Sequence, residues 1–195
     1  MKRTFIAIKT DPGEKIKDCI THCKTCLKSE KIKWISPLQL HFTLAFLGDT
    51  SINQVNLTGQ MLSRVIPAYD APVVQYKGLG LFRNIKDPKV LWIGLDIDPV
   101  ISKMKAELDR ELKNLGFRID KRDFRPHLTL ARIKWIQNKE VLKDLLQAYK
   151  EYYFQESTIW KLVYFESVLG PGGPKYKVIK NVRFKYASLS TGSGL

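Results

Sequence analysis

The chain has 195 residues, 44% of them hydrophobic, and its 33 Lys and Arg against 19 Asp and Glu give a formal net charge of +14. With no long polar or low-complexity tract, it is long enough for one compact unit that buries roughly 70% of its extended surface, which argues against two independent domains. No apolar stretch approaches membrane-spanning length and no signal segment follows the first residues, so we expect a cytoplasmic protein with no membrane association. The charge favours a polyanionic partner, although a basic surface also serves solubility.

The first predicted elements are a short buried strand at residues 5–8 and an amphipathic helix that runs to about residue 28. Asp11 and Pro12 place an N-cap acceptor and an N1 proline at the start of this helix. Cys19, Cys23 and Cys26 follow helical spacing, which places the three thiols on the apolar stripe. The helix therefore packs its cysteines into the core.

The same cysteines have the spacing C-x3-C-x2-C, which can also hold an iron–sulfur cluster. A cluster motif needs an exposed loop, whereas this segment follows a helix-start signal. We therefore favour core packing and interpret His22, which lies among the cysteines, as an ordinary surface residue. An odd number of unevenly spaced cysteines also argues against a disulfide framework and for a reducing compartment.

A predicted strand at residues 31–35 leads to the most informative segment, the sequence HFTLA at residues 41–45. Its alternation turns Phe42 and Leu44 into a core, while His41 and Thr43 share the other face of the strand. Beyond it, Val55 opens a second amphipathic segment, and residues 73–82 read as another strand.

The same phrase returns as HLTLA at residues 127–131, so that His127 and Thr129 repeat His41 and Thr43 at an offset of 86 positions (127 − 41 = 86). Its neighbours repeat as well. Residues 91–94 read as a strand that begins 36 positions before His127, just as residues 5–8 begin 36 positions before His41. The sequence therefore predicts an internal duplication.

Helix signals follow the same repeat. Asp98 and Pro99 give a second N-cap and N1 proline, before a helical pattern that ends near residue 115, and Val141 opens an amphipathic segment as Val55 does. We place the approximate repeats at residues 3–82 and 89–169. Strands are also predicted at residues 159–169 and 176–186.

These elements predict an α+β fold with two pseudo-symmetric lobes, each an antiparallel sheet with helices on its outer face. We expect one bilobal domain over residues 1–187, with residues 188–195 as a flexible tail. Pairing the two halves about a pseudo-dyad leaves a groove between them, and the two histidines are expected to line it.

The chemistry of the repeated phrase points to acid/base catalysis at an anion. An imidazole titrates near neutral pH, and a threonine hydroxyl two residues on can donate to an anionic oxygen. The sequence has no glycine-rich phosphate loop, no nucleophile elbow and no carboxylate cluster for a divalent metal. We therefore expect a site that works without a metal or other cofactor, and the basic charge favours a phosphate substrate.

These residues resemble the two-histidine (2H) phosphoesterases, and among them the RNA 2′,3′-cyclic phosphodiesterases also called LigT or ThpR. The resemblance spans nearly the whole chain. Besides the paired HxTL phrases it rests on short segments at residues 3–8, 33–35, 46–48, 79–82, 124–127, 129–132, 166–167 and 173–176.

The resemblance implies hydrolysis of a terminal 2′,3′-cyclic phosphate to a 2′-phosphate. It implies that His127 is the proton acceptor for water and His41 the proton donor to the leaving oxygen; spacing alone leaves the two equivalent. Thr43 and Thr129 are expected to donate to the non-bridging oxygens. Arg132 is the expected phosphate clamp, but its odd parity relative to His127 requires a bulge or twist to turn it inward.

The expected partners are RNA or nucleotide ends that bear a 2′,3′-cyclic phosphate, and no obligate protein partner is implied. Trp34, Phe82 and Tyr176 are candidates for stacking a terminal base, with core packing as the competing interpretation of each. Three alternative functions stay open at this point: 2′–5′ RNA ligation, hydrolysis of small cyclic nucleotides, and a non-catalytic RNA-binding module of the same fold.

Overall fold

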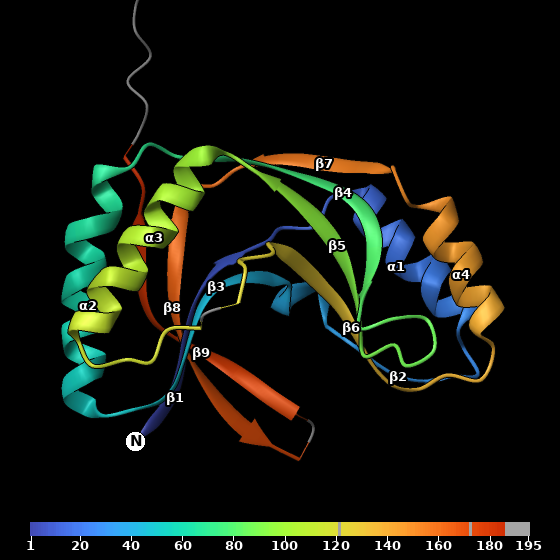
Figure 1. Ribbon diagram of the computed structural model, residues 1–195, viewed down its shortest axis with the longest axis horizontal. Helices are drawn as coiled ribbons and strands as arrows, with labels where there is room; N and C mark the ends of the chain where they lie inside the picture. Colours follow the sequence, from blue (N-terminus) through green and yellow to red (C-terminus); the bar gives the residue numbers. More distant parts are fainter. Residues whose placement is uncertain (121, 172, 186–195) are drawn as a thin grey trace, which may run out of the picture.

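A computed structural model describes residues 1–120, 122–171 and 173–185 (Figure 1). The tail expected at residues 188–195 lies outside the described residues. Two short 3₁₀ turns, Pro37–Gln39 and Ile66–Ala68, accompany the strands and helices. The described strands are β1 (Lys2–Lys9), β2 (Lys31–Trp34), β3 (His41–Thr50), β4 (Val73–Phe82), β5 (Val90–Ile97), β6 (His127–Trp135), β7 (Tyr153–Thr158), β8 (Lys161–Gly170) and β9 (Gly173–Arg183). The described helices are α1 (Glu14–Cys26), α2 (Ile52–Val65), α3 (Pro99–Asn114) and α4 (Lys139–Ala148).

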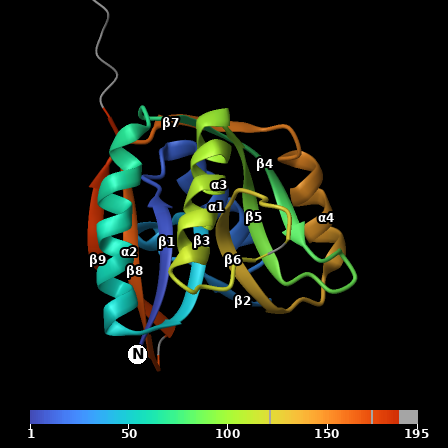
Figure 2. The same cartoon turned by 60° about the vertical axis from the view of Figure 1, so that its left-hand side comes forward.

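The strands form two antiparallel sheets, which confirms the predicted α+β class. Sheet A has the order β3-β1-β8-β9, and sheet B has the order β2-β6-β5-β4-β7. Figures 1 and 2 show α2 and α3 lying along sheet A, and α1 and α4 along sheet B. The helices cover the outer faces, so each sheet turns its other face toward the middle of the molecule.

Each sheet combines strands from both halves of the chain. In sheet A, β1 and β3 from the first half pair with β8 and β9 from the end, and in sheet B, β4 joins β5 and β6. The helices cross over in the same way, because α1 follows β1 of sheet A but lies against β7 of sheet B. The two lobes are therefore interleaved along the sequence.

The start of α1 differs from the expectation. The helix begins at Glu14 with Gly13 as N-cap and no side-chain cap, so the predicted cap at Asp11 is wrong. Gln155 of β7 explains the difference, because its side chain accepts from the Gly13 amide at 2.6 Å and donates to the Asp11 carbonyl at 3.1 Å. The corresponding prediction for α3 is confirmed, since the Asp98 side chain accepts from the Val100 amide at 2.8 Å.

The prediction for the cysteines is confirmed at two of three positions. Cys19 and Cys23 are buried on α1, whereas Cys26 in the last turn is exposed. Cys26 departs from the predicted stripe because the helix ends there, at the edge of the core. Among the described residues, no group of three or more His, Cys, Asp and Glu side chains is arranged to hold a metal ion. No described helix has the length and apolarity needed to cross a membrane.

Candidate active site

Each histidine of the repeat is the first residue of its strand. His41 opens β3 and His127 opens β6, and the alternation is as expected: Phe42 and Leu128 are buried under the helices. The two strands are neighbours in space although they belong to different sheets. The charge of His127 contributes to lowering the pKa of His41, so the fold brings the two imidazoles together.

Both imidazoles are held by the same backbone contact. The Nδ1 atom of His41 lies 2.6 Å from the Gln39 carbonyl oxygen, and Nδ1 of His127 lies 2.7 Å from the Arg125 carbonyl oxygen. A carbonyl oxygen only accepts, so Nδ1 carries the hydrogen in each ring. Each Nε2 is thereby left to receive a proton in the neutral ring or to donate one in the charged ring.

Burial lowers the pKa of both histidines. Desolvation is the main cause for His41, assisted by the charges of Arg132 and His127 and opposed by the hydrogen bond to Gln39. For His127, desolvation again comes first, the hydrogen bond to Arg125 opposes it, and the Arg132 charge adds to it. Both rings therefore favour the neutral form until an anion enters the site.

Aromatic side chains flank both rings. The His41 ring lies 5.1 Å from that of Tyr176, edge to face, and 5.2 Å from that of Phe5. The His127 ring lies 4.5 Å from that of Phe82, also edge to face. Two of the predicted stacking candidates therefore lie at the site, although their rings are engaged with the histidines themselves.

The third candidate, Trp34, is not brought to the site. It packs against the main core, and the ammonium of Lys24 on α1 lies 5.9 Å from its ring centroid, on the helix-covered side of sheet B. Trp92 of β5 occupies the inner face instead, 6.4 Å from the His127 ring. Its ring also lies over Gly80, where an added Cβ would stand 2.2 Å from it. Sequence reasoning assigned Trp92 to a buried strand and missed its place beside the histidine.

A β-bulge turns Arg132 toward the histidines. In the β5–β6 pairing, Leu91 is opposite Ala131 and Trp92 is opposite Thr129, which leaves Leu130 as the extra residue. Beyond the bulge Ala131 and Ile133 are buried, so Arg132 shares the face of His127 and Thr129. The arginine charge also acts on the pKa of Tyr176 and of both histidines.

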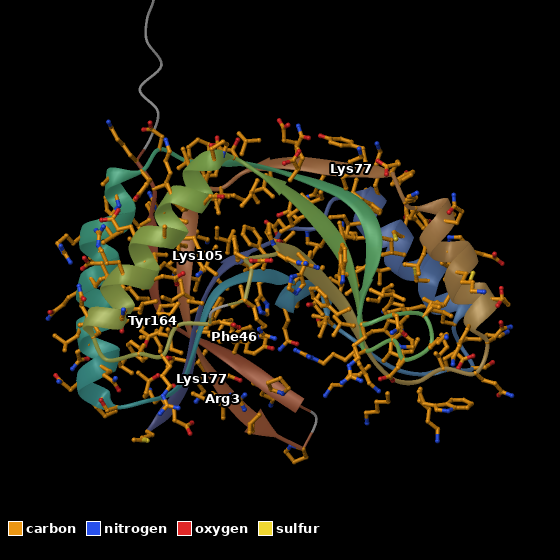
Figure 3. The ribbon with its side chains drawn as sticks, viewed as in Figure 1. Arg3, Phe46, Lys77, Lys105, Tyr164 and Lys177 are labelled. Carbon is orange, nitrogen blue, oxygen red and sulfur yellow. The ribbon has the colours of Figure 1, made fainter. Side chains whose placement is uncertain are left out.

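The first copy has the matching bulge at Leu44. Ile6 is opposite Ala45 and Ala7 is opposite Thr43, so Leu44 is the extra residue in β3. The residue that corresponds to Arg132 at the offset of 86 is Phe46 (132 − 86 = 46), labelled in Figure 3, and its side chain is 73% exposed. Phe46 was not predicted as a site residue, because an isolated Phe in a strand pattern carries no functional signal of its own.

Two antiparallel sheets, each presenting a histidine and a threonine from its strand, define a two-histidine site suited to phosphoester chemistry. A family model described as LigT like phosphoesterase matches the chain twice, over residues 8–92 and 95–176. The chain therefore belongs to the LigT-like phosphoesterases. Each of the two matched segments contains one of the two repeated histidines, His41 or His127.

Curated relatives and solved structures agree with this membership. A protein of Methanocaldococcus jannaschii named RNA 2′,3′-cyclic phosphodiesterase is 34% identical over 91% of this chain and 98% of its own length. One of the same name from Archaeoglobus fulgidus is 32% identical, with the same coverage of both chains. Among solved structures, one from Thermus thermophilus superposes with a TM-score of 0.76 at 22% identity, covering 95% of this chain and 100% of that one. E. coli LigT complexed with 3′-AMP gives 0.68 at 18% identity, covering 94% and 97%.

Proposed function

We propose that this protein is an RNA 2′,3′-cyclic phosphodiesterase that hydrolyses a terminal 2′,3′-cyclic phosphate to a 2′-phosphomonoester without a metal ion. The observation that carries the proposal is the pair of imidazoles from two sheets, each with Nδ1 fixed to a carbonyl and Nε2 available to a ligand. Relatives named for this activity at 27–34% identity support it.

In the proposed reaction a water oxygen attacks phosphorus while the bond from phosphorus to the 3′ oxygen breaks. His127 Nε2 takes a proton from the attacking water, and His41 Nε2 gives a proton to the departing 3′ oxygen. No net proton is lost, because one ring ends charged and the other neutral, and exchange with solvent resets both. The lowered pKa of His127 suits it to be neutral at the start.

The phosphate itself is proposed to be held by three side chains. Thr43 and Thr129 are half-buried on the face of the histidines, and we expect their hydroxyls to donate to the non-bridging oxygens. The guanidinium of Arg132 supplies positive charge and a bidentate fork at the same phosphate. Burial disfavours the charged form of both imidazoles, and a bound phosphate anion would stabilise the charged form of one of them.

We also propose that the protein is a single bilobal domain that arose by duplication and works in the cytoplasm. Corresponding bulges at Leu44 and Leu130 and the two family matches support the duplication. The three free thiols support a reducing compartment.

The test is an assay in EDTA with an RNA oligomer that ends in 2′,3′-cyclic phosphate, in which the phosphate isomer of the product is identified. We expect a 2′-phosphate from the wild type, and a loss on the order of 10²-fold or more in rate for His41→Ala and for His127→Ala. His22→Ala is the matched control, since this exposed histidine lies on α1 and bonds Tyr149. A folded wild type that binds the RNA without turnover would instead identify a binding module.

A further inference from the structure

A row of basic residues crosses sheet A beginning beside His41. In the β1–β3 pairing Lys9 lies directly opposite His41, and in the β8–β9 pairing Lys161 lies directly opposite Arg183. Lys9 and Lys161 line the same cavity, which joins the two pairs across β1 and β8. All three basic residues are exposed.

The cavity has a volume of about 290 Å³, and both polar and apolar side chains line it. Thr10, Ser157 and Thr158 line it together with the two lysines, and Trp160, 50% exposed, stands at its side. The lining is completed by Asp11, Tyr76 and Ile159.

No acidic partner neutralises this row. Over residues 1–120, 122–171 and 173–185, none of Lys9, Lys161 and Arg183 is in an ion pair, whereas eleven other pairs involve a Lys or Arg elsewhere. Asp11 is the one carboxylate among the lining residues. The two lysines of the wall, with Arg183 opposite Lys161 in the neighbouring strand, suit an anion with several acceptor oxygens, and a phosphodiester is such a group.

We propose that this cavity binds the RNA backbone phosphate on the 5′ side of the terminal nucleotide. The proposal rests on the proposed function, in which His41 faces the 3′ oxygen and therefore the terminal ribose. Adjacent strands lie roughly 5 Å apart, so Lys9 and Lys161 stand about one and two strand spacings from His41. The next phosphate of the chain, attached to the 5′ oxygen of that ribose, is within this reach.

The consequence is selectivity for chain length. A nucleoside 2′,3′-cyclic phosphate with a free 5′ hydroxyl has no phosphate to place in the cavity, whereas an oligomer has one. The enzyme is therefore expected to prefer the oligomer, and the preference is expected to fall with salt, since single-stranded contacts contribute a slope of about −0.7 each to log K against log salt.

The experiment compares kcat/KM for adenosine 2′,3′-cyclic phosphate and for an adenosine tetranucleotide that ends in 2′,3′-cyclic phosphate. The variants are Lys161→Ala, Lys161→Glu, Arg183→Ala and the double alanine variant. Lys9 is left unchanged because it lies directly opposite His41 in the β1–β3 pairing, so that a substitution there would also disturb the histidine. The control, Lys103→Glu on the outer face of α3, alters the net charge as Lys161→Glu does.

We expect the double alanine variant to lose about tenfold in kcat/KM on the tetranucleotide, to reduce the salt slope by about 1.4, and to leave the mononucleotide rate within about twofold. Lys161→Glu is expected to lose more, and the control to lose nothing. Equal losses on both substrates, or no loss on either, would overturn the upstream phosphate site. A wild type that turns over neither substrate would instead refute the proposed function, and the two failures are thereby distinguished.

Discussion

Backbone contacts orient the two imidazole rings, and each contact comes from a residue two positions before the histidine. Gln39 and Arg125 each present a carbonyl oxygen to Nδ1, so both rings are fixed in the tautomer that points Nε2 at a ligand. The hydrogen bonds favour the charged rings, yet burial outweighs them and lowers each pKa. The protonated form is therefore unstable until a substrate anion compensates for the lost hydration.

This balance predicts the pH profile. A general base must be neutral and a general acid must be protonated, and both folded-state pKa values lie below the ordinary 6.5. In the free enzyme, kcat/KM is thus expected to peak below pH 6.5. Bound phosphate stabilises the charged imidazole, so the maximum of kcat is expected at higher pH. Measured profiles with both maxima above pH 7 would contradict the assignment.

Arg132 is predicted to act through the geometry of its fork as well as its charge. Arg132→Ala is expected to lower kcat/KM on the order of 10²-fold, and Arg132→Lys to recover only part of this, because an ammonium cannot bind two oxygens in parallel. The control is Arg110→Ala on α3, where the arginine pairs with Glu107. The kcat/KM values are compared by steady-state kinetics at constant ionic strength. Full recovery of kcat/KM in Arg132→Lys would show that the charge alone, and not the fork, accounts for the effect of Arg132.

At the scale of the element, the matched bulges decide what each catalytic strand presents. Without the extra residue at Leu130, alternation would carry Arg132 to the buried face, where an unpaired guanidinium is costly. The same step at Leu44 exposes Phe46 in the first copy. The same kind of bulge therefore presents a cation in one strand and an aromatic ring in the other.

Two glycines give opposite predictions for stability. Gly80→Ala places a Cβ 2.2 Å from the Trp92 ring, so we expect a loss of about 1–3 kcal/mol in unfolding free energy, together with slower turnover as Trp92 shifts beside His127. Gly59→Ala in the middle of α2 meets only the flexible Lys180 side chain at 3.6 Å and is expected to gain about 0.5–1 kcal/mol. Urea unfolding measures both, and equal effects would refute the packing argument.

At the scale of the whole molecule, the interleaving of the halves makes the site a property of the complete chain. The first half lacks β8 and β9, and β4 would be separated from its partner β5. The buried faces of both sheets therefore depend on strands from both halves. The candidate active site lies where the sheets meet, so its geometry depends on strands from both halves.

We therefore expect neither residues 1–86 nor residues 87–195 to fold alone, despite the repeat in their sequences. Each fragment is predicted to lack near-ultraviolet circular dichroism and dispersed amide resonances, because it exposes unpaired strand edges and half of a core. The intact chain is the control. A folded fragment with dispersed resonances would show that the repeat is an autonomous unit.

The repeat identified the strands of His41 and His127 correctly, because alternation with apolar neighbours is a local property. Its alignment of residues 5–8 with residues 91–94 is wrong by one position, since Lys9 faces His41 whereas Gly94 faces His127. The chain from Lys9 to His41 spans 32 positions (41 − 9 = 32) and the chain from Gly94 to His127 spans 33 (127 − 94 = 33), so the offset of 86 does not hold along the whole repeat.

Distant contacts account for the remaining differences. The strand β7 escaped prediction because its burial comes from β4 in the sheet, and its residue Gln155 moves the start of α1 to Glu14. Trp34 lies on the helix-covered side of sheet B and Trp92 on the inner face, because the face that a side chain occupies depends on where the helices pack. Residues that meet across the two sheets are separated by long stretches of chain.

The sequence by itself determined the pair of His-x-Thr strands, most of the other helices and strands, and the anionic character of the ligand, because periodicity, residue chemistry and charge are local or additive properties. Only the tertiary structure decided that the two imidazoles share one site, that Arg132 turns toward them, and that Lys9, Lys161 and Arg183 form a row. Each of these depends on strand register and on which sheet a strand joins. Both are set by the burial of the whole core, which no local pattern records.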